Sequence, residues 1–116
     1  SNAHDMKGLL LAAIDDPDPV MVFEHKLLYK TKGEVPEEAY RVPIGKAHVA
    51  RTGTQATVVA TSIMVQKSLE AAETLAAEGI DIEVIDLRTL RPIDTDTIIT
   101  SVKKTTRLAC VYEGVK

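Results

Sequence analysis

The sequence has little of what usually reinforces a small fold. Cys110 is the single cysteine, which excludes an internal disulfide. Tryptophan is absent and aromatic residues make up 3% of the chain, so Val, Ile, Leu and Ala must supply the core. Because Cys110 lies in an apolar stretch, we expect it to be a buried structural thiol, which is consistent with a reducing compartment.

The chain also lacks the features of several functional classes. No apolar run approaches the roughly 18 residues of a membrane span, and no signal peptide is recognisable. A net charge of −3 argues against a nucleic-acid or anionic-membrane footprint, which needs a basic surface. The 116 residues suffice for one modest domain. Residues 1–3 look like a remnant of tag removal, so we expect the natural start to differ.

What the sequence does contain is an alternation of strand and helix patterns between Thr57 and Glu113. We predict a strand at 57–61, a helix that ends at Glu78, a strand at 80–87, a helix that begins at Asp94 and a strand at 107–112. Strands that alternate with helices predict a parallel sheet covered on both faces. The predicted fold class is α/β, a three-layer Rossmann-like parallel sheet.

Local signals define the two predicted helices. Small and apolar residues of the first fall on one stripe, and Gly79 is placed for a left-handed C-cap. Asp94 is a predicted N-cap for the second helix, and Ile93 and Ile98 stand at the two positions of a hydrophobic staple. Asp96 in its first turn and two lysines, Lys103 and Lys104, in its last turn suit the helix dipole.

The first 56 residues have a looser pattern. Asp5 is the predicted N-cap of a helix that Pro17 ends. Residues 20–23 are apolar on both faces and predict a buried strand without an evident partner, as if a preceding domain supplied its sheet. Residues 25–43 show no clear period and predict a connector. Residues 44–50 and a turn at Thr52-Gly53 predict a β-hairpin or a paired edge before the next strand.

Few residues suggest chemistry by themselves. There is no glycine-rich phosphate loop, no GxSxG elbow and no Cys/His spacing for zinc, and the histidines are dispersed surface or structural residues (His4, His25 and His48). A charged cluster follows the strand at 80–87 (Asp86, Arg88, Arg91 and Asp94). It could bind a ligand or partner at the strand ends, or its members could pair with one another. Three aspartates at the end of the first helix are either solvated or hold a cation.

The order of four blocks carries a family resemblance. Residues 5–10, 43–47, 69–80 and 83–94 resemble, in this order, the β subunit of the thiamine-diphosphate-dependent 2-oxo acid dehydrogenase E1 components, whose members include pyruvate, branched-chain and acetoin enzymes. By this resemblance, residues 4–24 are the end of a pyrimidine-binding domain, a helix and strand that precede the sheet. Residues 25–43 are an interdomain connector, and residues 44–116 are the first half of a transketolase C-terminal domain.

The resemblance also implies a function for the intact enzyme. It oxidatively decarboxylates a 2-oxo acid such as pyruvate, or cleaves acetoin, on thiamine diphosphate, and passes the acyl group to a lipoyl carrier. The implied partners are an E1 α subunit and a second β subunit in a heterotetramer, and a lipoyl-bearing E2 core, with neither nucleic acid nor membrane. The implied location is the bacterial cytoplasm or the mitochondrial matrix. Residues 33–38 look slightly more like the acetoin-type members.

The residues that the family uses for catalysis are not in this sequence. The activating glutamate and a substrate-side histidine lie upstream, and the α subunit mainly holds the diphosphate and Mg²⁺. We therefore assign no catalytic and no cofactor-binding residue here, and we expect this chain alone to be inactive. One family site maps onto it, a structural K⁺ site that would comprise Ala13, Ile14, Asp16 and Asp18, the first two through backbone carbonyls.

A different interpretation is a non-catalytic, flavodoxin-like binding or interaction module. The two interpretations differ in what they expect of residues 20–23. A strand there that is buried against a partner favours the E1 subunit. A monomer with all its strands in one closed sheet favours the binding module.

Overall fold

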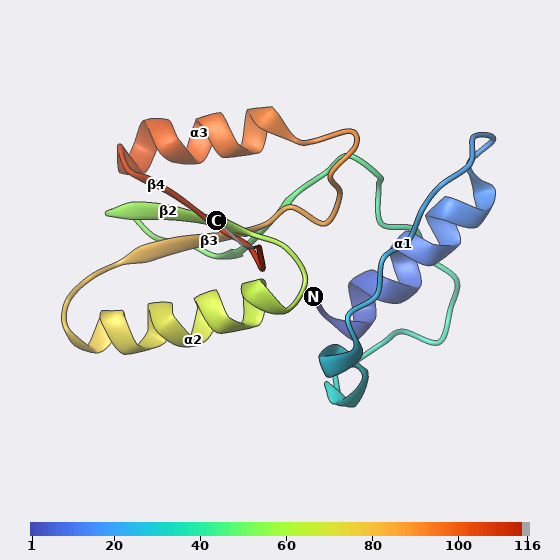
Figure 1. Ribbon diagram of the computed structural model, residues 1–116, viewed down its shortest axis with the longest axis horizontal. Helices are drawn as coiled ribbons and strands as arrows, with labels where there is room; N and C mark the ends of the chain where they lie inside the picture. Colours follow the sequence, from blue (N-terminus) through green and yellow to red (C-terminus); the bar gives the residue numbers. More distant parts are fainter. Residues whose placement is uncertain (115–116) are drawn as a thin grey trace.

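The fold is built around β3 (Ile82–Asp86), a strand whose five residues are all buried. The computed structural model describes residues 1–114. In it β3 pairs in parallel with β2 (Ala56–Ala60), and β2 pairs in parallel with β4 (Leu108–Val111). A fourth strand, β1 (His48–Arg51), lies antiparallel to β3, which gives the strand order β1-β3-β2-β4 (Figure 1).

Two helices cover the two faces of this sheet. α2 (Ile63–Ala77) lies on one face and α3 (Thr95–Thr105) on the other (Figure 1). The three-layer α/β fold is therefore confirmed. Of the two alternatives predicted for residues 44–53, the structure shows the paired edge: β1 pairs antiparallel with β3 and does not form a hairpin with β2. The turn after β1 passes tightly against β3, because a Cβ on Gly53 would lie 2.2 Å from the Ile82 carbonyl carbon.

The two sides of the sheet are packed differently. The α2 side is apolar, with Val65 and Ala72 of the helix against Ile82 and Val84 of the strand. The α3 side combines apolar residues with a buried hydroxyl network, in which Thr57 Oγ1 lies 2.6 Å from both Ser101 Oγ and Thr105 Oγ1. Such hydroxyl pairs replace the water that these groups would otherwise bind.

A buried carboxylate completes the network on the α3 side. The Glu83 side chain is 3% exposed; it accepts hydrogen bonds from Ser101 and Lys104, and the Gly53 N–H donates to it over 3.3 Å. Burial raises the pKa of Glu83, but the hydrogen bonds from Lys104, Ser101 and Gly53 outweigh it and leave the pKa below its usual value.

The helix ends follow the sequence signals closely. Gly79 has φ of +80° beyond the end of α2, and the Ile80 N–H closes the turn on the Leu75 carbonyl at 3.0 Å. Asp94 is the N-cap of α3 and accepts the Thr97 N–H at 3.2 Å. Acidic Asp96 lies in its first turn and two lysines in its last, as expected from the dipole.

The N-terminal region stands apart from the sheet and corrects two predictions. α1 (Ala3–Asp15) ends before Pro17 as predicted, but its N-cap is Asn2, because the Asn2 side chain accepts the Asp5 N–H at 2.7 Å. Residues 20–23 form no strand: no other strand of the described chain pairs with them, and a strand requires such a partner. Met21 is 78% and Phe23 80% exposed. The connector contains a short 3₁₀ helix, η1 (Lys26–Lys30).

Cys110 also departs from expectation. Its side chain lies on the same face of the sheet as α3, but it is exposed because β4 is an edge strand of the described sheet. Among the residues described, no helix is both long enough and apolar enough to span a membrane.

Candidate functional site at the carboxyl ends of the parallel strands

The carboxyl ends of the parallel strands meet at one edge of the sheet, and the N-terminus of the chain lies beside that edge (Figure 1). The chain turns sharply after β2 and after β3. Ser62 (φ 55°) and Arg88 (φ 58°) both have a positive φ, which residues other than glycine rarely adopt. Non-glycine residues are held at positive φ only where surrounding contacts fix them, and two of the three such residues within 1–114 lie at this edge; the third, Thr106, ends α3.

Arg88 makes the principal contact at this edge. Its Nε and Nη2 atoms donate to the two carboxylate oxygens of Asp5, each over 2.7 Å. Asp5 is 2% exposed and Arg88 15% exposed, so this is a buried, bidentate ion pair between α1 and the turn after β3. Burial raises the pKa of Asp5, but the hydrogen bonds from Arg88, His4 and Asn2 together leave the pKa below its usual value.

Further contacts fix the start of α1 against the sheet. Asp86 at the end of β3 accepts the Arg88 N–H at 3.0 Å and the Ser1 hydroxyl, and Gln66 of α2 donates to the Ser1 carbonyl over 3.0 Å. The His4 ring stacks on Tyr40 with centroids 4.5 Å apart, and the Tyr40 hydroxyl donates to the His4 carbonyl. The edge is therefore a docking point for α1.

The predicted charged cluster divides into two unrelated sets. Asp86 and Arg88 belong to the junction with α1. Asp94 instead accepts the Thr97 hydroxyl at 2.8 Å and the Ala47 N–H at 3.1 Å. The hydrogen bond from Thr97 lowers the pKa of Asp94 most, and the bond from Ala47 lowers it further. Arg91 is exposed and pairs with no carboxylate within residues 1–114. Within residues 1–114 no ion pair joins two members of the cluster, and the ion-pair partner of Arg88 is Asp5.

Sequence reasoning missed Asp5 as a site residue because nothing local marks it. It stands 83 residues from Arg88, and an aspartate in a first helical turn is ordinary. The histidines are dispersed as predicted. His4 belongs to the junction, His25 Nε2 lies 2.9 Å from Glu113 Oε2, and His48 is exposed on β1.

The four residues proposed for K⁺ lie at the end of α1. Pro17 has no N–H to offer the Ala13 carbonyl, and the Asp18 N–H donates to Asp16 Oδ1 over 3.0 Å instead of to the Ile14 carbonyl. Helix-end carbonyls and carboxylates are therefore grouped there, a donor set that fits a hard cation. Within residues 1–114 no group of three or more His, Cys, Asp and Glu residues forms a metal centre.

The strand ends do not fit a diphosphate. The turn between β2 and α2 has no glycine to bring backbone N–H groups close to a phosphate, and the carboxylates of Asp5 and Asp86 beside it would repel one. Arg88, the cation closest to these carboxylates, is committed to Asp5. The arrangement can hold two segments of chain together, and we assign it no catalytic step.

Comparison with known proteins places this architecture in a family. Residues 45–116 match the family model of the transketolase C-terminal domain, and the chain belongs to that family. A solved structure described as a split-gene transketolase, an inactive β4 tetramer, matches with a TM-score of 0.59 and 38% identity. The match covers 61% of this chain and 23% of that one.

More specific relatives confirm the resemblance to E1 β subunits. The chain is 52% identical over 114 residues to the β subunit of the acetoin:2,6-dichlorophenolindophenol oxidoreductase of Cupriavidus necator. This alignment covers 98% of this chain and 34% of the relative. It is 53% identical over 117 residues to the pyruvate dehydrogenase E1 component subunit β of Acholeplasma laidlawii. This alignment covers 100% of this chain and 36% of the relative. The chain thus spans about a third of the length of these relatives.

Proposed function

We propose that this chain is part of the β subunit of a thiamine-diphosphate-dependent E1 enzyme. In this proposal the whole enzyme oxidatively decarboxylates a pyruvate-like 2-oxo acid or cleaves acetoin, and it transfers the acyl group to a lipoyl carrier. The observation that carries the proposal is the identity of about one half, across nearly the whole chain, to pyruvate and acetoin enzyme β subunits. Because both kinds match equally well, the preference of residues 33–38 for the acetoin type stays a prediction.

The role that we propose for this part of the subunit is to join two domains. Residues 4–24 would end the pyrimidine-binding domain, and residues 44–116 would begin the C-terminal domain. The Asp5–Arg88 pair connects these two segments directly, and its bidentate geometry fixes both distance and orientation. A cofactor site between subunits depends on such rigid supports, since small displacements reduce catalysis strongly.

We propose that thiamine diphosphate and Mg²⁺ are held by other parts of the complex. The carboxylate-rich strand ends support this proposal, because they offer no phosphate site. When bound, thiamine diphosphate would supply the carbanion chemistry of decarboxylation. The proposed partners are an E1 α subunit, a second β subunit and a lipoyl-bearing E2 core.

The test is reconstitution of the full-length β subunit with its α partner. We expect turnover of pyruvate or acetoin with a dye acceptor, and a substantially lower rate when Arg88 is replaced by alanine. The matched control is Arg91→Ala, which removes an exposed arginine three residues away that forms no ion pair in the described part of the chain. Equal activity of the two variants would contradict the joining role, whereas inactivity of the wild-type complex on both substrates would contradict the proposed reaction.

A calorimetric titration of the 116-residue chain alone tests the location of the cofactor site. We expect no saturable binding of thiamine diphosphate with Mg²⁺. Stoichiometric binding would contradict the proposal and would favour a free-standing binding module instead.

We also propose that Ala13, Ile14, Asp16 and Asp18 contribute to a K⁺ site. The oxygen-rich end of α1 supports this, although Asp15 beside it is occupied by Arg41. We expect K⁺ to raise the melting temperature more than Na⁺ at equal ionic strength, and Asp18→Ala to remove the difference. Equal melting temperatures in the two salts would contradict the site.

A further inference from the structure

Residues 36–47, here called the strap, run along α1 and then reach the sheet (Figure 1). Hydrogen bonds join the strap to the backbone of the helix. The Val42 N–H donates to the Gly8 carbonyl over 3.1 Å. The Tyr40 hydroxyl donates to the His4 carbonyl over 2.7 Å. A Cβ on Gly8 would lie 2.5 Å from Val42 Cγ2, so the strap lies closer to the helix than a larger residue at position 8 would allow.

Lys7 adds a charged contact between α1 and the strap. Its Nζ atom donates to the carbonyls of Pro36, Glu37 and Glu38, the last two over 3.1 and 3.0 Å. An ammonium group has three N–H donors, so these three carbonyls use all of them, whereas a neutral amine would turn a lone pair toward one of the oxygens. The centre of the Tyr40 ring lies 5.1 Å from Nζ and adds a cation–π contact. The docked position of the strap therefore depends on the positive charge of Lys7.

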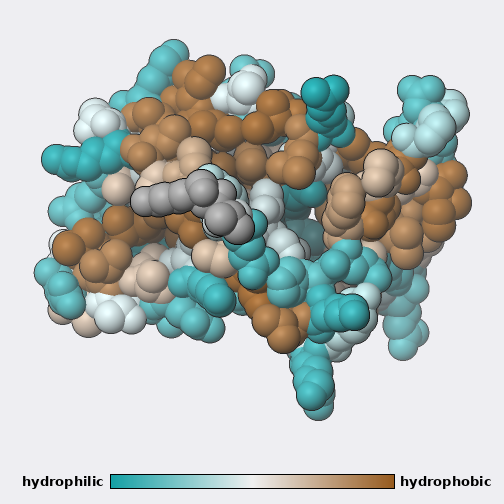
Figure 2. Space-filling view, in the orientation of Figure 1, coloured by the Kyte–Doolittle hydropathy of each residue, from teal (hydrophilic) through white to brown (hydrophobic). Residues whose placement is uncertain are grey.

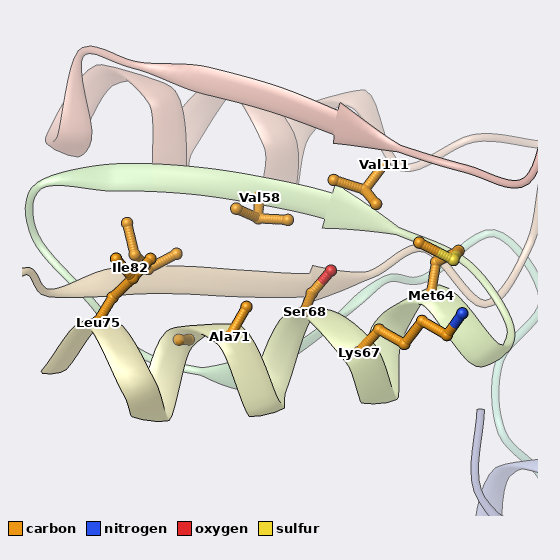
Figure 3. A pocket seen from close by; sticks show the side chains of 9 residues that line it. Val58, Met64, Lys67, Ser68, Ala71, Leu75, Ile82 and Val111 are labelled. Atoms are coloured by element: carbon orange, nitrogen blue, oxygen red, sulfur yellow. The ribbon is translucent and has the colours of Figure 1, made fainter. Parts of the chain in front are cut away.

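Little apolar surface is buried between the strap and α1. Val42 is buried there, but Ile14 of the helix is 69% exposed, and hydrophobic surface remains visible over α1 in the space-filling view (Figure 2). The contact between α2 and the sheet differs, because apolar side chains such as Leu75 and Ile82 meet there (Figure 3). Since apolar burial contributes little to the docking of the strap, a single charged group can decide whether the strap is docked.

The far end of the strap is fixed to the loop that follows β3. The Gly45 N–H donates to Thr89 Oγ1 over 3.1 Å, and the Ala47 N–H donates to Asp94 Oδ2 over 3.1 Å. Gly45 has φ of +83°, which favours glycine at this turn. The strap therefore contacts α1 at one end and the sheet at the other, and it forms a bridge that is separate from the ion pair at the start of α1.

We propose that the strap holds α1 in a fixed orientation on the sheet and that the Lys7 ammonium keeps the strap docked. A helix attached at one point is free to turn about that point, whereas a second, separate attachment removes this freedom. The Asp5–Arg88 pair is one attachment and the strap is the other. The consequence for catalysis rests on the joining role proposed above, since α1 and the sheet belong to the two domains which that role connects. Removing the charge of Lys7 releases the strap and leaves the sheet folded.

Hydrogen exchange of the 116-residue chain tests the role of Lys7, with the Val42 amide as the reporter because its N–H binds α1. We expect Lys7→Met, which keeps a long side chain without charge or donors, to raise the exchange rate of this amide about tenfold or more, since three hydrogen bonds from a charged group are lost. Lys7→Arg keeps the charge and several N–H donors, so it should retain most of the protection. The matched control is Lys30→Met, which removes an exposed lysine of the same connector and should leave the Val42 rate unchanged.

Gly8→Ala separates docking of the strap from the stability of the helix itself. Alanine favours a helix more than glycine does, so an effect on the helix alone would slow exchange in α1 and at Val42. The added Cβ would instead meet Val42 Cγ2 at 2.5 Å and Tyr40 Cε2 at 2.8 Å. We therefore expect the strap to be displaced and exchange at Val42 to become faster.

Spin labels at Ile14→Cys and Glu37→Cys, in a Cys110→Ser background, measure the distance between α1 and the strap directly. Both labelled positions are exposed, and Cys110 is the single native cysteine. We expect one narrow distance distribution, which Lys7→Met broadens and Lys7→Arg preserves. Circular dichroism establishes that each variant is folded.

Four outcomes would overturn the proposal. They are a broad distance distribution with Lys7 in place, unchanged exchange at Val42 in Lys7→Met, an equal effect of Lys30→Met, and slower exchange at Val42 in Gly8→Ala. All these measurements use the 116-residue chain, so they do not depend on the proposed reaction. A docked strap together with an inactive whole complex would contradict the reaction alone.

Discussion

The sheet and the N-terminal helix have similar apolar content but use it in opposite ways. All five residues of β3 are buried, and Val84 and Ile85 are 0% exposed. Of the 13 residues of α1, only Asp5 and Gly8 are buried, and Ile14 is 69% exposed. Apolar sequence therefore makes a core only where other elements cover it, and α1 with residues 20–23 presents apolar surface that no described element covers.

The two regions also differ in what holds them in place. The sheet rests on hydrophobic packing between its faces and two helices. α1 is attached mainly by polar contacts. Besides the Arg88 pair, Lys7 Nζ donates to the carbonyls of Pro36, Glu37 and Glu38, and it lies 5.1 Å from the centre of the Tyr40 ring. Because polar attachments depend on single groups, individual substitutions should release α1 and leave the sheet folded.

The largest expected effect is on the free energy of unfolding, and it is seen by comparing substitutions of two isoleucines. Ile85→Ala leaves a cavity beneath α3 and should destabilise the chain by about 2–5 kcal/mol. Ile14→Ala removes the same atoms from an exposed position and should change stability by less than about 0.5 kcal/mol. Urea unfolding followed by circular dichroism measures both. Similar costs at the two positions would mean that α1 is as well packed as the sheet.

The next effect concerns the attachment of α1. Arg88→Ala leaves the buried Asp5 carboxylate without its cation, a loss of about 3 kcal/mol for the docked state of the helix. Hydrogen exchange should show lost protection in α1 and unchanged protection in β3. Arg91→Ala is the control, because that side chain is exposed and forms no ion pair within residues 1–114. Loss of protection throughout the sheet would show that the two regions unfold as one unit.

The sequence predicts the sheet and its two helices well and the N-terminal region poorly. The strands and helices from β2 to β4 were predictable because their patterns, the Asp94 cap and the Gly79 turn are local signals. The antiparallel pairing of β1 with β3 was not, since it depends on the close passage of Gly53 over a strand 30 residues away. The strand predicted at 20–23 failed because a strand requires a partner, and composition does not reveal whether one is present.

The site shows the same limit. The sequence marks Arg88 and Asp86 as charged residues at a strand end, where parallel sheets commonly bind ligands or partners. It does not identify Asp5, because an ion pair between distant segments leaves no local pattern. Cys110 was predicted to be buried from its apolar neighbours, but its strand proved to be an edge. Exposure in an edge strand depends on the order of strands, which periodicity does not encode.

Acid should release α1 as well, by a smaller amount than Arg88→Ala, because a protonated Asp5 still forms hydrogen bonds. The pKa values of Asp5 and Glu83 are lowered in the folded chain. A carboxylate with a lowered pKa contributes stability that is complete above its unfolded value, about 4, and is lost as the pH falls through the folded value. Hydrogen exchange at pH 6 and pH 3, corrected for intrinsic rates, should show protection lost in α1 before β3. Simultaneous loss would indicate that Glu83 controls both regions.

The smallest effect tests a local signal within the well-packed region. Asp94→Ala removes the N-cap of α3 together with the acceptor for the Ala47 N–H, and it should cost about 1 kcal/mol. Asp96→Ala, two residues later, removes a favourable interaction with the helix dipole and no N-cap, so it should cost about 0.3 kcal/mol. If the dependence of the unfolding free energy on denaturant is the same for both variants, their denaturation midpoints give the two free-energy losses. If both variants cost the same, the dipole alone would account for the effect, and the hydrogen bonds of Asp94 would contribute no net stability. If Asp94→Ala also exposes β1 to hydrogen exchange, the Ala47 contact holds this antiparallel edge strand against the sheet.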